Sequence, residues 1–281
     1  MQVTTLLENT KVEKANLINK HGLSLYIKTG GQKILFDTGP DDSLLHNAAE
    51  LGIDLAEVNI LVISHIHRDH GGGLGVFLKN NSKAKVYLNT NTQREYYVQR
   101  SATEFEYIGL DQAVLKTYHD RLNYVWEKTS IAPGITLLRN TEYSGFRAKT
   151  INIRLEDGSI GQDSFDHELI MVLEEQGVLH VFTGCSHNGI TNMVESVKKE
   201  FPGQKIQSLT GGFHLMNPHT GVIAEDEDTV KGLARKLLEQ DIPYIYTGHC
   251  TGPEAFKIMQ GILRERLGGL STGKRITVPQ R

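Results

Sequence analysis

The sequence predicts an α/β fold in which two β-sheets pack face to face and helices cover their outer faces. Two observations support this prediction. Short apolar runs typical of strands occur in both halves of the chain, and stretches with helical apolar spacing separate them. The 281 residues, 39% of them hydrophobic, suffice for a sizeable core, and the sequence contains no repeat or low-complexity tract. We therefore expect one domain that spans residues 1–281.

The first half of the chain contains predicted strands and one predicted helix. The helix, at residues 41–51, follows Pro40, a common start signal, and its apolar residues recur at intervals of three and four. The strands are short apolar or alternating runs bounded by polar and turn residues. They are predicted at residues 3–7, 23–29, 33–36, 60–63 and 86–88.

The second half repeats this alternation of strands and helices. Residues 169–173 and 178–183 are predicted to form a hairpin across the turn at 174–177. Two more strands follow, separated by helices. The strands are predicted at residues 206–209 and 244–246, and the helices near residues 191–200 and 228–240.

Between the two halves, residues 91–140 are rich in aromatic side chains and show no clear periodicity. We interpret this stretch as an insertion that could lie over a binding pocket. A helical subdomain that packs its aromatic side chains for stability explains the same composition. The sequence leaves both interpretations open.

Three histidines and one aspartate lie within six residues, directly after a predicted strand. His65 and His67 can point the same way, whereas Asp69 and His70 lie where three glycines turn the chain toward a helix. Imidazole and carboxylate are the ligands expected for Zn, Fe or Mn, and two neighbouring ligand pairs suit two ions bridged by a water. The alternative is a solvated, histidine-rich loop. The density of the motif between a strand and a glycine turn favours a metal site.

Two later histidines share this placement at the end of a predicted strand. His187 follows the strand at 178–183, and His249 follows the strand at 244–246, each with a glycine between. Strand ends of one sandwich can deliver such residues to the edge where the first motif lies. We therefore expect His187 and His249 to complete the metal site, with hydrogen-bonded loop histidines as the alternative.

His214 follows Gly211 and Gly212 after another predicted strand, and this segment suggests a substrate-binding role. The glycines would let backbone N–H groups approach an anion, and a histidine there could hydrogen-bond a phosphate or donate a proton. A glycine turn that only allows a strand and a helix to pack explains the same residues.

The two cysteines, Cys185 and Cys250, each lie near a histidine in a glycine-containing loop. A structural disulfide is not expected in a cytoplasmic chain. Each cysteine could be a small buried hydrophobe or could line the metal site.

Taken together, these segments resemble the metallo-β-lactamase superfamily. The pattern His-x-His-x-Asp-His at residues 65–70 is its signature, and residues 34–39 resemble the strand and turn that precede it. Other segments resemble one branch, which includes a 7,8-dihydropterin-6-methyl-4-(β-D-ribofuranosyl)aminobenzene 5′-phosphate synthase and relatives of unassigned activity. These segments are residues 7–10, 21–25, 183–187, 211–215 and 248–252.

The resemblance implies the αββα four-layer sandwich of the metallo-β-lactamase type and one or two divalent metal ions, with zinc expected and iron or manganese as alternatives. His249 matches the last metal-ligating histidine of the superfamily. His187 lies near the position of a bridging aspartate, but this chain has Cys185, Ser186 and His187 there. This departure suggests that metal occupancy or identity differs. Asp69 could orient an activated water or take its proton.

We therefore expect a metal-dependent enzyme that acts on a phosphorylated small molecule. Its reaction would be a condensation of a pterin with a ribosyl-aminobenzene phosphate, as the resemblance implies, or the hydrolysis of a phosphoester. The synthase joins two molecules with loss of pyrophosphate. The alternatives are a general metallohydrolase of esters, lactones or thioesters, and a non-catalytic metal-binding protein.

Charge and the N-terminal sequence bear on partners and location. The net charge of −3 argues against a nucleic-acid-binding surface. The N-terminus lacks the basic start and long apolar core of a secretory signal, and no apolar run approaches membrane-spanning length. We expect a cytoplasmic protein whose partner is a phosphorylated small molecule, and the oligomeric state stays open.

Overall fold

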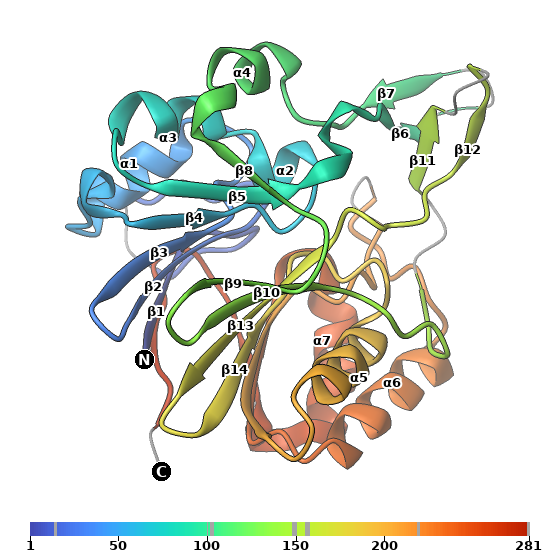
Figure 1. The fold of residues 1–281 in the computed structure, drawn as a ribbon. Helices are drawn as coiled ribbons and strands as arrows, with labels where there is room; N and C mark the ends of the chain where they lie inside the picture. Colours follow the sequence, from blue (N-terminus) through green and yellow to red (C-terminus); the bar gives the residue numbers. More distant parts are fainter. Residues whose placement is uncertain are drawn as a thin grey trace.

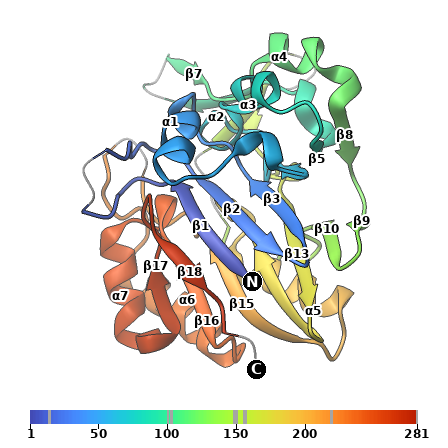
Figure 2. The ribbon, with the colours of Figure 1, turned by 90° about the vertical axis from the view of Figure 1, so that its left-hand side faces the viewer.

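The structure is a computed structural model, and it describes residues 1–13, 16–99, 101, 104–147, 151–154, 158–217 and 220–279. Across these residues the chain forms two seven-stranded sheets and one four-stranded sheet, with helices outside the two large sheets (Figures 1 and 2). The inner faces of the large sheets share one buried cluster, which includes Ile34 of the first and Met171 of the second. The fold is the αββα sandwich that the sequence predicts.

The first large sheet contains most strands of the N-terminal half. They are β1 (Gln2–Leu7), β2 (Ser24–Thr29), β3 (Gln32–Phe36), β4 (Ile60–Val62), β5 (Lys85–Asn89), β8 (Leu122–Val125) and β18 (Arg275–Thr277). Their order is β18-β1-β2-β3-β4-β5-β8, so a C-terminal strand lies at one edge. β3, β4 and β5 pair in parallel, which places their carboxyl ends at the same edge of the sheet.

Helices of the N-terminal half cover the outer face of this sheet (Figure 1). They are α1 (Ser43–Glu50), α2 (Arg68–Gly71), α3 (Leu74–Asn80) and α4 (Gln112–Thr117). Leu44 of α1 and Phe77 of α3 pack in one buried cluster with Leu35 and Leu61 of the sheet. Side chains alternate along a strand, so Leu35 faces these helices while its neighbours face the other sheet.

The second large sheet contains strands from the C-terminal half together with β9 and β10. They are β9 (Thr129–Ala132), β10 (Ile135–Arg139), β13 (Leu169–Glu175), β14 (Val178–Phe182), β15 (Lys205–Gly211), β16 (Tyr244–Thr247) and β17 (Leu267–Gly269). The order is β17-β16-β15-β14-β13-β10-β9. β13 and β14 form the predicted hairpin, and β14 to β17 run parallel.

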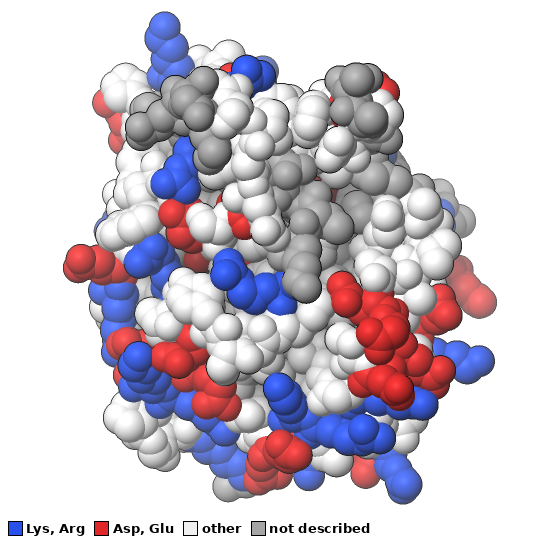
Figure 3. Space-filling view, turned by 90° about the vertical axis from the view of Figure 1, so that its right-hand side faces the viewer, with Lys and Arg blue, Asp and Glu red and all other residues white. Residues whose placement is uncertain are grey.

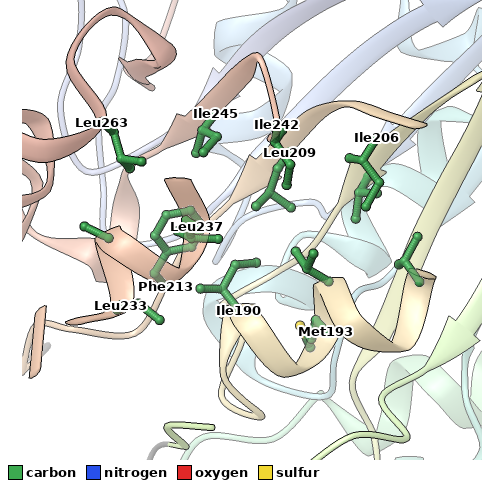
Figure 4. Close-up of a cluster of buried hydrophobic side chains, with 14 of the residues drawn as sticks. Ile190, Met193, Ile206, Leu209, Phe213, Leu233, Leu237, Ile242, Ile245 and Leu263 are labelled. Atoms are coloured by element: carbon green, nitrogen blue, oxygen red, sulfur yellow. The ribbon is translucent and has the colours of Figure 1, made fainter. Parts of the chain in front are cut away.

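Three helices cover the outer face of the second sheet: α5 (Ile190–Glu200), α6 (Glu227–Glu239) and α7 (Pro253–Leu263). Figure 4 shows Met193 of α5, Leu237 of α6 and Leu263 of α7 around the sheet residues Leu209 and Ile245. All five side chains are buried. Burying large aliphatic side chains stabilises a fold by about 1.5–3 kcal/mol each, so this cluster anchors the three helices.

A small third sheet stands apart from the sandwich (Figure 1). Its strands are β6 (Tyr96–Gln99), β7 (Phe105–Tyr107), β11 (Ile151–Arg154) and β12 (Ile160–Gln162), in the order β12-β11-β6-β7. Residues 91–140 thus supply strands to all three sheets, since β8 and β10 belong to the sandwich. Residues 100, 102 and 103 of this stretch lie outside the described residues. An insertion that covers the pocket stays a prediction.

The predicted strands and helices are present, with bounds that differ by a few residues. The strands β6 to β12, β17 and β18 and the helices α2, α4 and α7 were not predicted. β17 and β18 have three residues each, and β17 contains two glycines, so neither has a recognisable apolar run. Short 3₁₀ helices are η1 (Leu55–Glu57), η2 (Thr90–Gln93), η3 (His119–Arg121), η4 (His249–Thr251) and η5 (Arg264–Arg266). None of the helices in the described ranges has the length and apolar character needed to cross a lipid bilayer.

Candidate metal centre

The loops after β4, β14 and β16 meet at one end of the sandwich. His65, His67 and His70 come from the first loop, His187 from the second and His249 from the third, and all five rings are buried. The ring centroids of neighbouring pairs are 4.2–5.2 Å apart. Parallel pairing explains this convergence, because it aligns the carboxyl ends of β14, β15 and β16.

Four donor atoms from Asp69, His70, Cys185 and His249 form one compact group. The Nε2 atoms of His70 and His249 are 3.1 Å apart, and the sulfur of Cys185 lies 3.1 and 3.3 Å from them. Oδ2 of Asp69 lies 3.6 Å from the His70 nitrogen and 3.2 Å from the His249 nitrogen. Donors around a tetrahedral zinc ion lie about 3.3–3.8 Å apart, given bonds of about 2.0–2.3 Å. The group therefore fits a divalent metal ion.

A second set of donors lies beside the first. Nε2 of His65, Nε2 of His67 and both ring nitrogens of His187 are buried, and none has a hydrogen-bond partner within the described ranges. His65 and His187 form a candidate metal group with Cys185, and His65 and His67 form another with Asp69. A buried polar atom without a partner costs about 1–3 kcal/mol. Several such nitrogens in one place fit a metal ion, which accepts their lone pairs.

Hydrogen bonds on the far side of three rings determine which nitrogen faces the centre. The His70 Nδ1 lies 2.6 Å from Oδ2 of Asp37, the His65 Nδ1 lies 2.9 Å from Oγ of Ser64, and the His249 Nδ1 lies 2.9 Å from Oδ1 of Asn9. Ser64 itself donates its hydroxyl to Asp37 at 2.7 Å. When Nδ1 donates to such an acceptor, Nε2 keeps its lone pair. Each ring is thus oriented to bind a metal through Nε2.

Burial and neighbouring charges shift the pKa values of these groups in opposite directions. Burial, reinforced by adjacent histidines, lowers the pKa of His65 and His187 well below the ordinary value and that of His67 to about 3. Burial also opposes the charged form of His70, but the carboxylates of Asp37 and Asp69 raise its pKa to about 9. The first three rings are therefore neutral near pH 7, the form that binds metal ions.

Asp69 is the partly exposed member of the cluster, with 22% of its side chain accessible. Burial would raise its pKa, but His70, His21 and His249 hold the pKa of this carboxyl well below its usual range. His21 contacts Asp69 Oδ2 through Nε2 at 3.3 Å, and its ring lies 4.6 Å from that of His249. The sequence offered no motif that assigned His21 to the site. Its position before Gly22, in a segment that resembles the synthase branch, was the available signal.

The segment before β13 supports the loop that carries His187. Glu168 accepts hydrogen bonds from the backbone amides of His187 at 2.7 Å and Asn188 at 2.8 Å. His167 is buried but satisfied, because Nδ1 accepts from the amide of Ile66 and Nε2 pairs with Asp163 at 2.8 Å. These residues position the loop and the histidine motif.

Backbone strain is concentrated at this end of the fold. Among the described residues, eight non-glycine residues have positive φ, and five of them lie in segments at the candidate centre. The five are Asp37 (φ 62), Phe165 (φ 56), Ser186 (φ 57), His214 (φ 46) and His249 (φ 51). Such conformations cost about 1–3 kcal/mol each and tend to persist at functional sites.

Gly211 and Gly212 lie in close packing with neighbouring loops, and the anion site expected there stays a prediction. The amide of Gly212 donates to the carbonyl of Gly184 at 2.7 Å and is not free for a ligand. A Cβ at Gly211 would lie 2.2 Å from Oγ1 of Thr183, and one at Gly212 would lie 2.5 Å from Sγ of Cys250. The absent side chains therefore let the strand ends approach each other.

His214 lies beside the metal cluster. Its ring is 4.1 Å from the ring of His187, and its buried Nδ1 has no hydrogen-bond partner among the described residues. It also forms a candidate metal group with Cys185 and Cys250. Both cysteines are free and buried. The structure thus brings Cys185, Cys250 and His214 to the same place as the six predicted ligands, whose binding of metal stays a proposal.

Comparisons with known proteins agree with this geometry. A family model described as the metallo-beta-lactamase superfamily matches residues 19–147. The 7,8-dihydropterin-6-methyl-4-(beta-D-ribofuranosyl)-aminobenzene-5′-phosphate synthase of Methanocaldococcus jannaschii is 28% identical, over 98% of this chain and 96% of that protein. An uncharacterized protein of the same organism is 28% identical over 90% of this chain and 91% of its own.

A solved structure resembles the whole chain. Tm1679, described as a metal-dependent hydrolase of the beta-lactamase superfamily, matches with a TM-score of 0.83 and 26% identity, over 100% of both chains. The resemblance seen in the sequence motifs is thereby confirmed. The chain is thus similar to proteins of the metallo-β-lactamase superfamily, and over nearly its whole length to a synthase of this kind.

Proposed function

We propose that this chain is a metal-dependent enzyme of the metallo-β-lactamase superfamily that acts on a phosphorylated small molecule. The observation that carries the proposal is the set of four donor atoms from Asp69, His70, Cys185 and His249 at tetrahedral spacing. The substrate class rests on the likeness to the dihydropterin synthase, which extends over nearly the whole chain. A condensation of a pterin with a ribosyl-aminobenzene phosphate, or hydrolysis of a phosphoester, are the two reactions that we propose.

The residues of the site have separable roles in such a reaction. A bound divalent ion would lower the pKa of water and polarise an oxygen of the substrate. Asp69 is ionised and partly exposed, so its carboxylate can accept a hydrogen bond from a water molecule or substrate hydroxyl and orient it. His21 contacts the same carboxylate oxygen and holds it in place. The buried side chains of His65, His67, His70, His187 and His249 would hold the metal ion.

His214 is the residue that we propose for contact with a substrate phosphate. Its Nδ1 is unpaired in the described structure, and its ring adjoins His187. The test is inhibition by inorganic phosphate and pyrophosphate in wild type and in His214→Asn, with His119→Asn, an exposed histidine on η3, as the control. We expect weaker inhibition only in His214→Asn. Equal inhibition in all three proteins would remove His214 from the substrate site.

The function is tested by removing and restoring the metal. The protein would be stripped with a chelator and reloaded separately with zinc, iron or manganese. Two activities would then be measured: pyrophosphate release from a dihydropterin-6-methyl diphosphate mixed with a ribofuranosylaminobenzene phosphate, and cleavage of simple phosphoesters. We expect one of these activities in a reloaded sample and none in the stripped protein. Equal activity with and without metal would contradict the proposal.

Substitutions sharpen this test. His65→Ala and Asp69→Ala should abolish activity while the circular dichroism spectrum stays that of a folded protein, because both side chains serve the site. The exposed pair His119 and Asp120 on η3 offers matched controls, His119→Ala and Asp120→Ala, which should retain activity. Loss of structure together with metal binding would show that the centre is structural.

A general metallohydrolase of esters, lactones or thioesters is the second candidate. The likeness to Tm1679, a metal-dependent hydrolase by its description, supports it. Both candidates use the same ligands and differ in the substrate pocket. Turnover of carboxylic esters, lactones or thioesters, without pyrophosphate release and without inhibition by phosphate, would favour this hydrolase.

We also propose that the partner is a small molecule and that the protein acts in the cytoplasm. The net charge of −3 supports a small-molecule partner over a nucleic acid. On the face in Figure 3, basic and acidic side chains are intermixed, and acidic ones gather toward one side. Localisation of a tagged chain and electrophoretic mobility assays with RNA and DNA would test both statements.

A further inference from the structure

We propose that the sulfur of Cys185 bridges two metal ions in the candidate centre. The inference rests on the proposed function, because it takes the cluster to be a metal centre. One ion would be held by Asp69, His70 and His249 together with this sulfur, and the other by His65 and His187 together with the same sulfur. The resemblance places an aspartate near this segment, where this chain has Cys185, Ser186 and His187.

The placement of the sulfur between the two donor sets is the first support. Sγ of Cys185 lies 3.1 Å from the His70 nitrogen and 3.3 Å from the His249 nitrogen, within the first set. The same atom forms a candidate group with His65 and His187, with all donor atoms within 4.8 Å of one another. Cys185 is therefore a member of both sets.

The two cysteines differ in what surrounds their sulfur atoms. Sγ of Cys250 accepts a hydrogen bond from the amide of His214 at 3.3 Å and donates to the carbonyl of Cys185 at 3.6 Å. The Cys185 sulfur lies 3.1 Å from Nε2 of His70 and 3.3 Å from Nε2 of His249. The Cys250 sulfur is thus surrounded by backbone groups and by the side chains of Cys185 and His214, whereas the Cys185 sulfur also contacts the ring nitrogens of His70 and His249.

The backbone around Cys185 is built for this close approach. A Cβ at Gly184 would lie 2.2 Å from Oγ of Ser64 and 2.8 Å from Nδ1 of His65, so glycine is required beside the histidine motif. Ser186, on the other side, has φ 57 and directs the chain sharply toward His187. Cys185 and His187 are only two residues apart, and this turn of the chain lets both side chains reach the donor sets.

The chemistry of a thiolate suits a bridging role. A metal-bound cysteine is deprotonated, and its sulfur keeps further lone pairs for a second ion. Its bond to zinc is about 2.3 Å, longer than that of a carboxylate oxygen, so one atom can reach two adjacent ions. The other roles open to Cys185 are a terminal ligand to one ion and a buried side chain that packs without binding.

Cobalt(II) titration of the metal-free wild-type protein distinguishes these roles. A thiolate bound to cobalt gives a sulfur-to-metal charge-transfer band in the near ultraviolet. A bridging sulfur predicts that this band grows with both the first and the second equivalent, and that electron paramagnetic resonance detects magnetic coupling between the two ions. A band that stops growing after one equivalent, with two uncoupled ions, would overturn the bridge. A two-cobalt protein without the band would overturn sulfur ligation altogether.

Variants assign the signals to one sulfur. Cys185→Ser should abolish the band and the coupling, and Cys250→Ser is the matched control, which should keep both. Cys185→Asp replaces sulfur by a carboxylate and should restore two-ion binding without the band. A band that survives in Cys185→Ser and disappears in Cys250→Ser would contradict the assignment. These signals do not require a known substrate.

The outcomes separate this inference from the proposed function. If cobalt binds to the expected stoichiometry but without a sulfur band, the bridge fails while a metal-dependent enzyme remains supported. If the wild-type protein binds no cobalt, zinc, iron or manganese, both proposals fail together. If the bridge is observed but no phosphorylated substrate turns over, only the proposed function is weakened.

Discussion

Several histidines at the candidate metal centre are paired with a second residue, which hydrogen-bonds the ring and orients it toward the centre. Asp37 illustrates this arrangement, since its carboxylate accepts from the Ser64 amide at 2.7 Å and contacts His70 Nδ1 at 2.6 Å. It is fully buried, so its charge is balanced within the protein. Partners of this kind orient metal ligands and increase their basicity.

We predict that Asp37→Asn weakens metal binding by about 10–100-fold, because the neutral amide no longer stabilises the donor on His70. Asparagine also tolerates the positive φ of this residue, so the backbone should keep its conformation. Competition with a chromophoric chelator would measure the affinity. Asp54→Asn, at an exposed 3₁₀ N-cap, is the control. An affinity equal to that of wild type would show that Asp37 serves only the fold.

His21 is predicted to position Asp69. His21→Gln should lower activity about tenfold, since a hydrogen bond to a charged group contributes about 1.5–3 kcal/mol, while the metal content stays unchanged. The decrease should appear in kcat and not in KM, because the carboxylate is expected to act on the reacting group. Steady-state kinetics with metal analysis would measure this. Loss of metal in the variant would instead make His21 part of the binding site.

Among the secondary-structure elements, the parallel strands decide where the functional loops lie. β14, β15 and β16 end side by side, and glycines at those ends allow their loops to touch the histidine motif. Gly184 and Gly212 are two examples of such close approach. At these positions a Cβ would clash with neighbouring loops, so glycine leaves the space that the close approach needs.

Gly184→Ala should destabilise the protein by about 1–3 kcal/mol and weaken metal binding, because the new methyl group would displace Ser64 and His65. Urea unfolding would measure the free energy. The control is Gly232→Ala in α6, where a Cβ would meet no atom within 4 Å. This substitution should stabilise the protein by about 0.4–1 kcal/mol. Equal stability of the two variants would contradict the packing role of Gly184.

In the whole molecule, the buried histidines link stability to pH. His65, His67 and His187 have folded-state pKa values below the ordinary 6.5, so the unfolded chain binds protons more readily. His70 has the opposite shift, to about 9, so its contribution is complete below pH 6.5 and is lost as the pH rises toward 9. Below pH 6.5 the three lowered pKa values therefore decide how stability changes with pH, because the His70 contribution is constant there.

We therefore predict that the metal-free protein loses stability as the pH falls below about 6.5, and loses a smaller amount between pH 6.5 and 9. Thermal melts of the chelator-treated protein across this range would measure Tm. Metal at 100 times its Kd should add about 2.7 kcal/mol to the free energy of unfolding at neutral pH. A Tm that stays constant from pH 7 to pH 5 in the metal-free protein would contradict the linkage.

Local patterns were enough to predict much of this molecule. The alternation of strands and helices indicated the sandwich, and the spacing of His65, His67, Asp69 and His70 indicated a metal site, because both are properties of neighbouring residues. The placement of His187 and His249 after strands also followed from local sequence. The short edge strands β9, β17 and β18 could not be predicted, since their pairing partners stabilise them more than their own residues do.

The sequence by itself thus indicated the fold class, the resemblance to the superfamily and the six candidate ligands. Only the tertiary structure decided that His21 and Cys185 lie beside them, that Asp37 and Asn9 orient the rings, and that Gly211 and Gly212 lie in close packing. The physical reason is distance along the chain. His21 meets residues 69 and 249, and Cys185 meets residues 70 and 249, through folding that aligns strand ends from both sheets. No local pattern encodes such contacts.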